Sequence, residues 1–375
     1  MSNPSLSGPS MNIVDPDPRA LLIELFHVAV ATAQPARVLA DFLPANRTQS
    51  ALVIGAGKAA CSMVSCLEQH WPGPLRGLVV TAYGHSEPLQ RIEVIEAGHP
   101  VPDAMSERAA KRILALVASL GADDLVICLI SGGGSSLLAL PAPGISLADK
   151  QDINRALLKS GATIDEINRV RKHLSAIKGG RLGLACTPAR LLTLAISDVP
   201  GDDPATIASG PTAADPSTSS EALSILQKYR LPIPSAITAW LKNPVSETPK
   251  PGDSRLCNND YRIIASARHS LEAAARQAQQ AGFNTLLLGD DISGESRDVA
   301  REHAALALAI AKGSGPVSPP CIILSGGETT VTVRGDGKGG RNGEYLLALA
   351  NSLRGTPGIY ALAADTDGID GAGDN

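Results

Sequence analysis

Two glycine-rich segments, each at the end of a short apolar run, contain the residues best suited to hold an anion. GAGKAA (55–60) ends the run that begins at Ser50, and SGGGSS (131–136) follows the run 124–130. Glycine lets a backbone approach an oxyanion closely, a lysine adds a full positive charge, and serine hydroxyls add donors. We therefore predict an anion site here; the alternative for each segment is a tight turn needed only for packing. The predicted site residues are Gly55, Gly57, Lys58, Ser131, Gly132, Gly133, Gly134, Ser135 and Ser136.

The first segment matches neither of the two familiar phosphate motifs completely. Lys58 is not followed by Ser or Thr, so the segment is not a Walker A loop. The spacing G-x-G-x-x-A does fit the dinucleotide fingerprint, but the next apolar run ends in TAYG (81–84), without the acidic residue that binds a ribose hydroxyl. This absence disfavours a nicotinamide site and leaves a general anion site.

Carboxylates follow two further apolar runs and are candidate metal ligands. Asp198 and Asp202 come after the run 190–196, and Asp367 lies in DTDGIDG (365–371). Magnesium bound with nucleotide phosphates typically takes one or two carboxylates plus waters. We predict Asp198, Asp202 and Asp367 as Mg²⁺ ligands, while Asx turns are the alternative for each cluster.

Two cationic segments have different expected roles. Arg341 stands at the start of a predicted helix, and arginine suits bidentate contact with phosphate or carboxylate. A helix-capping salt bridge is the alternative for that residue. The run RVRKH (169–173) is expected to be a solvated helix face.

Composition excludes several classes of function. The net charge of −4 gives no general reason to expect nucleic-acid or membrane partners. The seven histidines show no metal-binding spacing, the six cysteines form no CxxC pair, and no G-x-S-x-G elbow is present. Residues 1–18 lack the features of a signal peptide, and no apolar run approaches the ~20 residues of a membrane span. We therefore expect a cytoplasmic enzyme of small-molecule chemistry.

The elements that position these segments suggest two α/β domains. A chain of 375 residues exceeds the ~250–300 residues at which one core stops growing, and short apolar runs alternate with helical patterns throughout. A stretch rich in Pro, Ser and Thr (213–260) marks the boundary. We predict a flexible tail (1–18), a first domain (19–240) and a second domain (241–375).

Three local elements are predicted in detail. The helix before residue 120 is expected to begin near Ser106, whose partner Ala109 allows no capping box. Alternating residues predict a strand over 329–334, after a loop at SGGE (325–328), and another strand is expected over 358–363.

Seven segments together resemble the type II glycerate kinases, whose C-terminal part is called the MOFRL domain. The resemblance implies a Rossmann-like three-layer N-terminal domain and a smaller α/β domain with a mixed sheet. It implies that Lys58 and Arg341 are the catalytic cations and adds Glu328 to the binding residues. It also implies that ATP and Mg²⁺ are needed to convert D-glycerate into 2-phosphoglycerate. The matching segments are GAGKAA (55–60), GHPVPD (98–103), SGGGSSLL (131–138), INRVRKHLSAIKGGRL (167–182), SDVPGDDPATIASGPT (197–212), LSGGETTVTVRGDGKGGRNGEYLLALA (324–350) and AADTDGIDG (363–371).

Alternatives to the kinase stay open at this point. Similar proteins have been labelled hydroxypyruvate reductases, which would use NAD(P)H, and a non-catalytic sugar-acid sensor is a third reading of the same motifs. Members of the family continue beyond TDGIDG, so this chain is expected to be truncated after residue 371. The sequence leaves a homodimer open.

Overall fold

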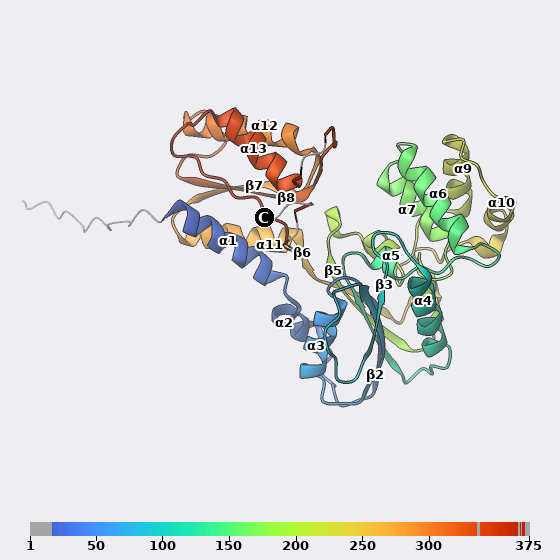
Figure 1. Ribbon diagram of the computed structural model, residues 1–375. Helices are drawn as coiled ribbons and strands as arrows, with labels where there is room; N and C mark the ends of the chain where they lie inside the picture. The colour runs from blue at the N-terminus through green and yellow to red at the C-terminus, as the bar shows by residue number, and fades with distance from the viewer. Residues whose placement is uncertain (1–16, 336–337, 367, 369, 372–375) are drawn as a thin grey trace, which may run out of the picture. The chain divides into compact units, whose positions relative to one another are not determined.

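The chain folds into two compact units. The structure is a computed structural model that describes residues 17–335, 338–366, 368 and 370–371. Residues 31–270 form the larger unit, and the described residues up to 30 together with those from 271 onward form the smaller one (Figure 1). This division differs from the boundary expected after residue 240. The physical reason is that strand β6 (Asn259–Ser266) pairs with β5 in the main sheet.

The larger unit contains a six-stranded sheet in which every strand runs parallel to its neighbours. Its order is β3-β2-β1-β4-β5-β6. Parallel strands are buried on both faces, which explains why the sequence shows them as continuous apolar runs rather than alternating ones. The strands preceding β6 are β1 (Ala51–Ala56), β2 (Leu75–Ala82), β3 (Glu93–Ala97), β4 (Leu125–Ile130) and β5 (Arg190–Ser197).

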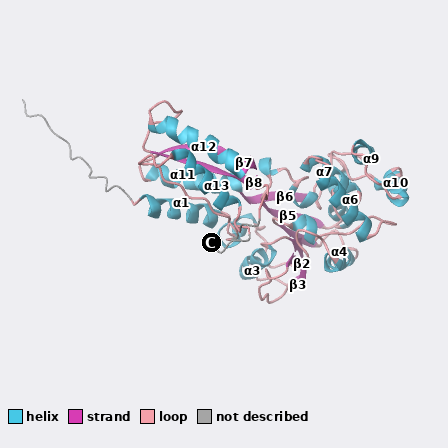
Figure 2. Ribbon diagram, turned by 45° about the horizontal axis from the view of Figure 1, so that its top comes forward, coloured by secondary structure: helices cyan, strands magenta, loops and turns pink. Residues whose placement is uncertain are grey.

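Helices cover both faces of this sheet and complete three layers. Leu52 and Ile54 face α4 (Ala104–Val117), whereas Val53 between them faces α3 (Ala60–His70). Figure 2 shows α3 and α4 on opposite sides of the strands. The predicted Rossmann-like layering is therefore confirmed.

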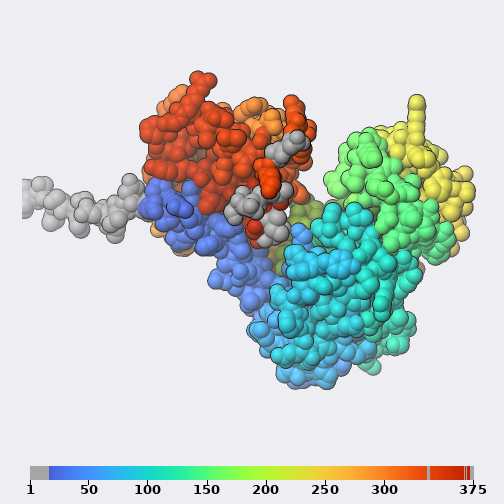
Figure 3. Space-filling model, viewed as in Figure 1, coloured from blue at the N-terminus to red at the C-terminus, as the bar shows by residue number. Residues whose placement is uncertain are grey.

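A block of helices in the larger unit has a core of its own. Figure 3 shows this block in green and yellow beside the sheet layers. Its interior is built from aliphatic residues such as Ile153, Ile167 and Leu226. The block contains α6 (Leu147–Lys159), α7 (Ile164–His173), α9 (Ser219–Lys228) and α10 (Ser235–Leu241). The short helices of the unit are α2 (Pro35–Val38), α5 (Gly134–Leu137) and α8 (Arg181–Ala185).

The smaller unit is an α/β layer around two strands. β7 (Asn284–Glu295) and β8 (Cys321–Thr330) pair in parallel, so the described pairing shows none of the antiparallel neighbours that a mixed sheet would have. Helices α1 (Pro18–Thr32) and α11 (Ala267–Gln280) share one core with Ile322 of β8. Helices α12 (Ser296–Ala311) and α13 (Arg341–Leu353) share another.

Several sequence predictions are corrected here. α4 begins at Ala104 because the carboxylate of Asp103 accepts hydrogen bonds from the amides of Met105 and Ser106, while the Ser106 hydroxyl accepts one from the Asp103 amide. Ser106 is thus the partner in a capping box and does not itself start the helix. β8 continues through the expected SGGE loop and ends at Thr330, and residues 358–363 form no strand. α1 starts at Pro18, and residues 1–16, on which nearly all of the predicted tail falls, lie outside the described part. No described helix has the length and apolar character needed to cross a membrane.

Candidate active site

The two glycine-rich segments of the larger unit meet where the order of the strands reverses direction. β1 and β4 are neighbours, but the chain goes from β1 to β2 on one side and from β4 to β5 on the other. In open parallel sheets this arrangement leaves a crevice beyond the carboxyl ends of the two strands, where ligands usually bind. The segments 55–60 and 131–136 therefore lie at the expected position for a ligand site.

Hydrogen bonds lock these two segments together. The Lys58 amide donates to the Gly132 carbonyl over 2.8 Å, and the Ala59 amide donates to the Ser131 hydroxyl over 3.0 Å. In return, the Ser131 amide donates to the Ala56 carbonyl over 3.2 Å. The structure thus brings Lys58 together with the serine- and glycine-rich loop, as the sequence analysis expected.

Two of the glycines are required by these close approaches. Gly57 has φ = 149°, and a Cβ there would overlap the side chain and backbone of Ser131. Gly133 has φ = 81°, and a Cβ there would lie 2.9 Å from the ring of His99 and 3.6 Å from Cγ of Lys58. Neither position accepts a larger residue without a shift of the loop.

Asp198 and His99 flank the same loop. A Cβ at Gly132 would lie only 2.6 Å from a carboxylate oxygen of Asp198, which follows β5 directly. Burial, then the charges of Lys58 and His85, lowers the pKa of His99, so its imidazole is neutral at pH 7. The sequence analysis missed His99 as a site residue, although its position just beyond the end of β3 could have indicated it.

A buried lysine supports the loop from the inside of the protein. The side chain of Lys178 is within 2.5 Å of the Ser135 carbonyl and 3.3 Å of the Ser135 hydroxyl, to both of which its Nζ can donate. That hydroxyl lies 2.8 Å from the hydroxyl of Ser209. The sequence analysis also missed Lys178 and Ser209 as site residues, although both lie in segments that carry the family resemblance, 167–182 and 197–212.

Strained backbone is concentrated in the segment that follows β5. Asp202, Ala208 and Ser209 have positive φ angles of 54°, 51° and 61°. Such conformations cost roughly 1–3 kcal/mol each outside glycine and are typical of functional sites. The predicted ligands Asp198 and Asp202 lie in or just before this segment, and Asp367 lies outside the described residues. Among the residues that the structure describes, no group of three His, Cys, Asp or Glu side chains is arranged to hold a metal ion.

The segment 169–173, expected to be solvated, is only partly so. Arg169 is partly exposed and pairs with Asp165 over 2.7 Å. Lys172, in contrast, is buried and pairs with Asp215 over 2.6 Å, and His173 is fully buried. The prediction is therefore wrong for Lys172 and His173, whose side chains contact Asp215 and Glu247 outside the helices of the block.

In the smaller unit, Arg341 is the first residue of α13 and is held by two carboxylates. Its guanidinium lies 2.6 Å from Glu328 and 3.5 Å from Asp365. The Asp370 carboxylate accepts hydrogen bonds from the amides of Asn342 and Gly343, each over 2.9 Å. Asp365 and Asp370 therefore orient Arg341 and the start of its helix. Glu328, predicted to contact substrate, has Arg341 as a partner.

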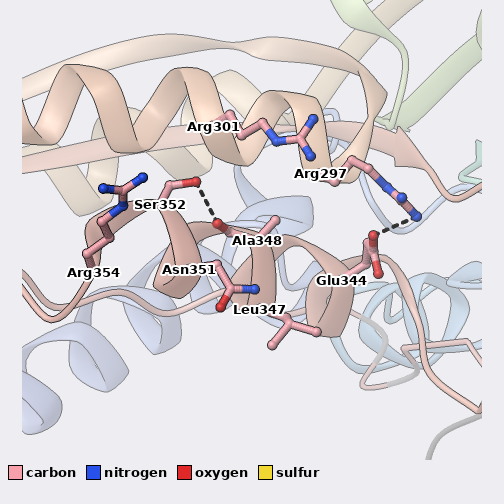
Figure 4. A pocket seen from close by; sticks show the side chains of 8 residues that line it. All are labelled: Arg297, Arg301, Glu344, Leu347, Ala348, Asn351, Ser352 and Arg354. Carbon is pink, nitrogen blue, oxygen red and sulfur yellow. Dashed lines mark hydrogen bonds and ion pairs between the residues drawn. The ribbon is translucent and has the colours of Figure 1, made fainter.

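A pocket of about 480 Å³ lies between α12 and α13 (Figure 4). It is lined by Arg297, Arg301 and Arg354 together with Glu344, and Arg297 pairs with Glu344 over 2.9 Å. None of the predicted site residues lines it. The pocket is thus separate from the contacts that hold Arg341.

Family models match both parts of the chain. A model described as a domain of unknown function (DUF4147) matches residues 21–242, and one described as the MOFRL family matches residues 321–375.

The names of the relatives refer to two different activities. A protein from Agrobacterium vitis, provisionally named a hydroxypyruvate reductase, is 50% identical over 363 residues, which cover 96% of this chain and 82% of that protein. A D-glycerate 2-kinase from Thermotoga maritima is 39% identical over 358 residues, covering 95% of this chain and 84% of the kinase. A glycerate 2-kinase from Pyrococcus horikoshii is 42% identical over 329 residues, covering 86% and 73%.

A solved structure agrees with these sequence matches. The crystal structure of a glycerate kinase from Thermotoga maritima superimposes with a TM-score of 0.85 at 38% identity, covering 95% of this chain and 85% of that one. The fold of this chain thus matches that of the kinase over nearly its whole length. The chain therefore belongs to the type II glycerate kinase, or MOFRL, family.

Proposed function

We propose that the protein phosphorylates D-glycerate to 2-phosphoglycerate, with ATP as the phosphoryl donor and Mg²⁺ as the metal. The observation that supports this best is the pair of glycine-rich segments locked to each other at the β1–β4 crevice, with Lys58 beside them. Such a site suits a small anion that also carries hydroxyl groups, because backbone groups, serine hydroxyls and a cation surround it.

Phosphoryl transfer asks the protein mainly for alignment and charge neutralisation. The 131–136 loop and Lys58 would hold glycerate, and Lys58 and Arg341 would stabilise the charge on the transferred group. The ion pairs of Arg341 with Glu328 and Asp365 keep its guanidinium ordered before any phosphate is present. The guanidinium of Arg341 therefore needs no further residue to orient it for its proposed role.

The donor set near β5 is compatible with Mg²⁺. Asp198 and Asp202 offer the hard carboxylate oxygens that this ion prefers, and Asp198 is exposed where it flanks Gly132. Asp198, Asp202 and Asp367 are the residues proposed to hold it. When bound with nucleotide, Mg²⁺ neutralises charge on the phosphate oxygens.

The same hydrogen bonds weaken the case for a nicotinamide enzyme. In a dinucleotide fold the amides that follow the first glycines bind the pyrophosphate. Here the amides of Lys58 and Ala59 already donate to Gly132 and Ser131. β2 also ends at Ala82 without a carboxylate. These observations favour the kinase over the hydroxypyruvate reductase.

An assay of the purified protein discriminates between a glycerate kinase and a hydroxypyruvate reductase. ADP formation that needs D-glycerate, ATP and Mg²⁺ is expected, without oxidation of NAD(P)H in the presence of hydroxypyruvate. Lys58→Ala and Arg341→Ala are each expected to lower kcat by on the order of 10²–10³-fold. Lys228→Ala is the control, because Lys228 is exposed and pairs with Glu166 in the helical block. Reductase activity without kinase activity, or a fully active Lys58→Ala variant, would refute the proposal.

We further propose that the protein acts in the cytoplasm. Its six cysteines are free thiols, four of them buried, as is usual in a reducing compartment. Cell fractionation with an antibody against the protein tests this, and recovery in a secreted or periplasmic fraction would contradict it.

A further inference from the structure

Lys178 is a buried cation that contacts the proposed substrate loop from behind. Only 2% of the residue is exposed, and its Nζ donates to the carbonyl of Ser135 over 2.5 Å. The Ser135 hydroxyl, 3.3 Å from the same nitrogen, is 2.8 Å from the Ser209 hydroxyl. Lys178 therefore connects the 131–136 loop to the strained segment after β5.

No carboxylate neutralises this lysine in the described part of the chain. The charged groups that act on it are two further cations. Lys150 donates to the Leu174 carbonyl over 3.3 Å, and Arg171 donates to the Asn154 side chain over 2.7 Å. The three cations thus have neutral hydrogen-bond partners only. Lys172, close to them in sequence, shows the contrasting arrangement, because it pairs with Asp215.

A buried charge without a counter-ion is costly, and proteins normally supply a partner for it. Burial, reinforced by Lys150 and Arg171, lowers the pKa of Lys178 well below its ordinary value. A negatively charged group bound at the loop would reverse part of this effect, since an opposite charge favours the protonated amine. Lys178 therefore lacks a counter-ion in the described protein, and a negatively charged substrate bound at the loop can provide one.

We propose that Lys178 is a positioning residue that selects substrates carrying a carboxylate, by fixing the 131–136 loop through Ser135 and by providing the counter-charge to the bound acid. This inference rests on the proposed function and deepens it, because it names the feature of the substrate that the site recognises. The selected class is 2-hydroxy carboxylates, as opposed to neutral polyols. Lys58 remains the cation assigned to the transferred phosphoryl group.

The test compares D-glycerate with glyceramide, in which a neutral amide replaces the carboxylate. The ratio of kcat/KM for the two substrates is measured in wild type, Lys178→Met and Lys178→Gln. Wild type is expected to prefer the acid, and both variants are expected to lose roughly 10- to 100-fold of that preference, mainly through KM for D-glycerate. Lys178→Arg, which keeps the charge, is expected to restore much of it.

Lys172→Met is the matched control, because it removes another buried ammonium, whose charge Asp215 already balances. It is expected to lower the melting temperature without changing the substrate ratio. An unchanged ratio in Lys178→Met and Lys178→Gln, or a wild type that uses both substrates equally, would overturn the inference while leaving the kinase intact. A wild type that phosphorylates neither substrate would instead refute the proposed function.

Discussion

Replacing Lys150 is expected to stabilise the protein in a strongly pH-dependent way. Lys150 is 7% exposed, and its ammonium donates only to the Leu174 carbonyl. Burial, with added repulsion from Arg171 and Arg181, lowers its pKa from 10.5 to about 7. Between these two values the unfolded chain holds a proton that the folded protein releases. The free energy of unfolding therefore rises with pH across this range, and the destabilisation caused by the buried Lys150 ammonium is largest below pH 7.

The magnitude follows from the shift in pKa. Each pKa unit corresponds to about 1.4 kcal/mol, so the lowering to about 7 costs the folded state on the order of 5 kcal/mol at low pH and nothing above the unfolded pKa. Lys150→Met removes that cost but also a hydrogen bond worth about 1 kcal/mol. We expect a net gain of about 3–4 kcal/mol near neutral pH.

Urea unfolding of wild type and Lys150→Met from about pH 6 to about pH 10 measures this difference. The advantage of the variant should shrink steadily as the pH rises. Lys111→Met, which removes an exposed lysine on α4, is the control and should change stability by less than about 0.5 kcal/mol. A difference that stays constant with pH, or that grows toward high pH, would show that the buried ammonium is not the cause.

Three further changes have defined outcomes. Asp215→Asn leaves Lys172 buried without its counter-ion, so the free energy of unfolding measured in urea should fall by about 3–5 kcal/mol. A loss below about 1 kcal/mol would show that the ion pair between Lys172 and Asp215 does not form. Gly133→Ala places a Cβ 2.9 Å from the ring of His99 at a φ of 81°. KM for D-glycerate should therefore rise roughly tenfold or more, while the circular dichroism spectrum stays unchanged. An unaltered KM would argue against this loop as the binding site. Asp103→Ala removes the cap of α4 and should lower the melting temperature, by the equivalent of about 1 kcal/mol, whereas an equal melting temperature would indicate that the cap is not formed.

The sequence predicted best what depends on neighbouring residues. β1, β4 and β5 are apolar runs because parallel strands are buried on both faces, and the glycines after β1 and β4 are needed where the loops touch. Their position at one crevice follows from the order of the strands. These features therefore emerge from local pattern together with the general rules of α/β folds.

The predictions failed where partners far apart in the sequence decide the outcome. The glycines of SGGE suggested a loop, yet a Cβ at Gly327 would overlap the backbone of Ile292, so the glycine is required by the pairing of β7 with β8. Lys178 can be identified as a site residue only from its contact with Ser135, which is 43 residues away in the sequence. Burial of Lys172 likewise depends on Asp215. The pairing of such distant residues leaves no periodic signal in a single sequence.

The assignment of α1 to the smaller unit has a consequence for synthesis on the ribosome. Leu21 and Leu25 emerge early, but Ala274, Ala278 and Ile322, which share their core, follow up to about 300 residues later. At ~5–20 residues per second this delay is about 15–60 s, during which residues 31–270 can already fold. During this time the apolar face of α1 remains uncovered in the nascent chain, which makes it a place where a chaperone can bind.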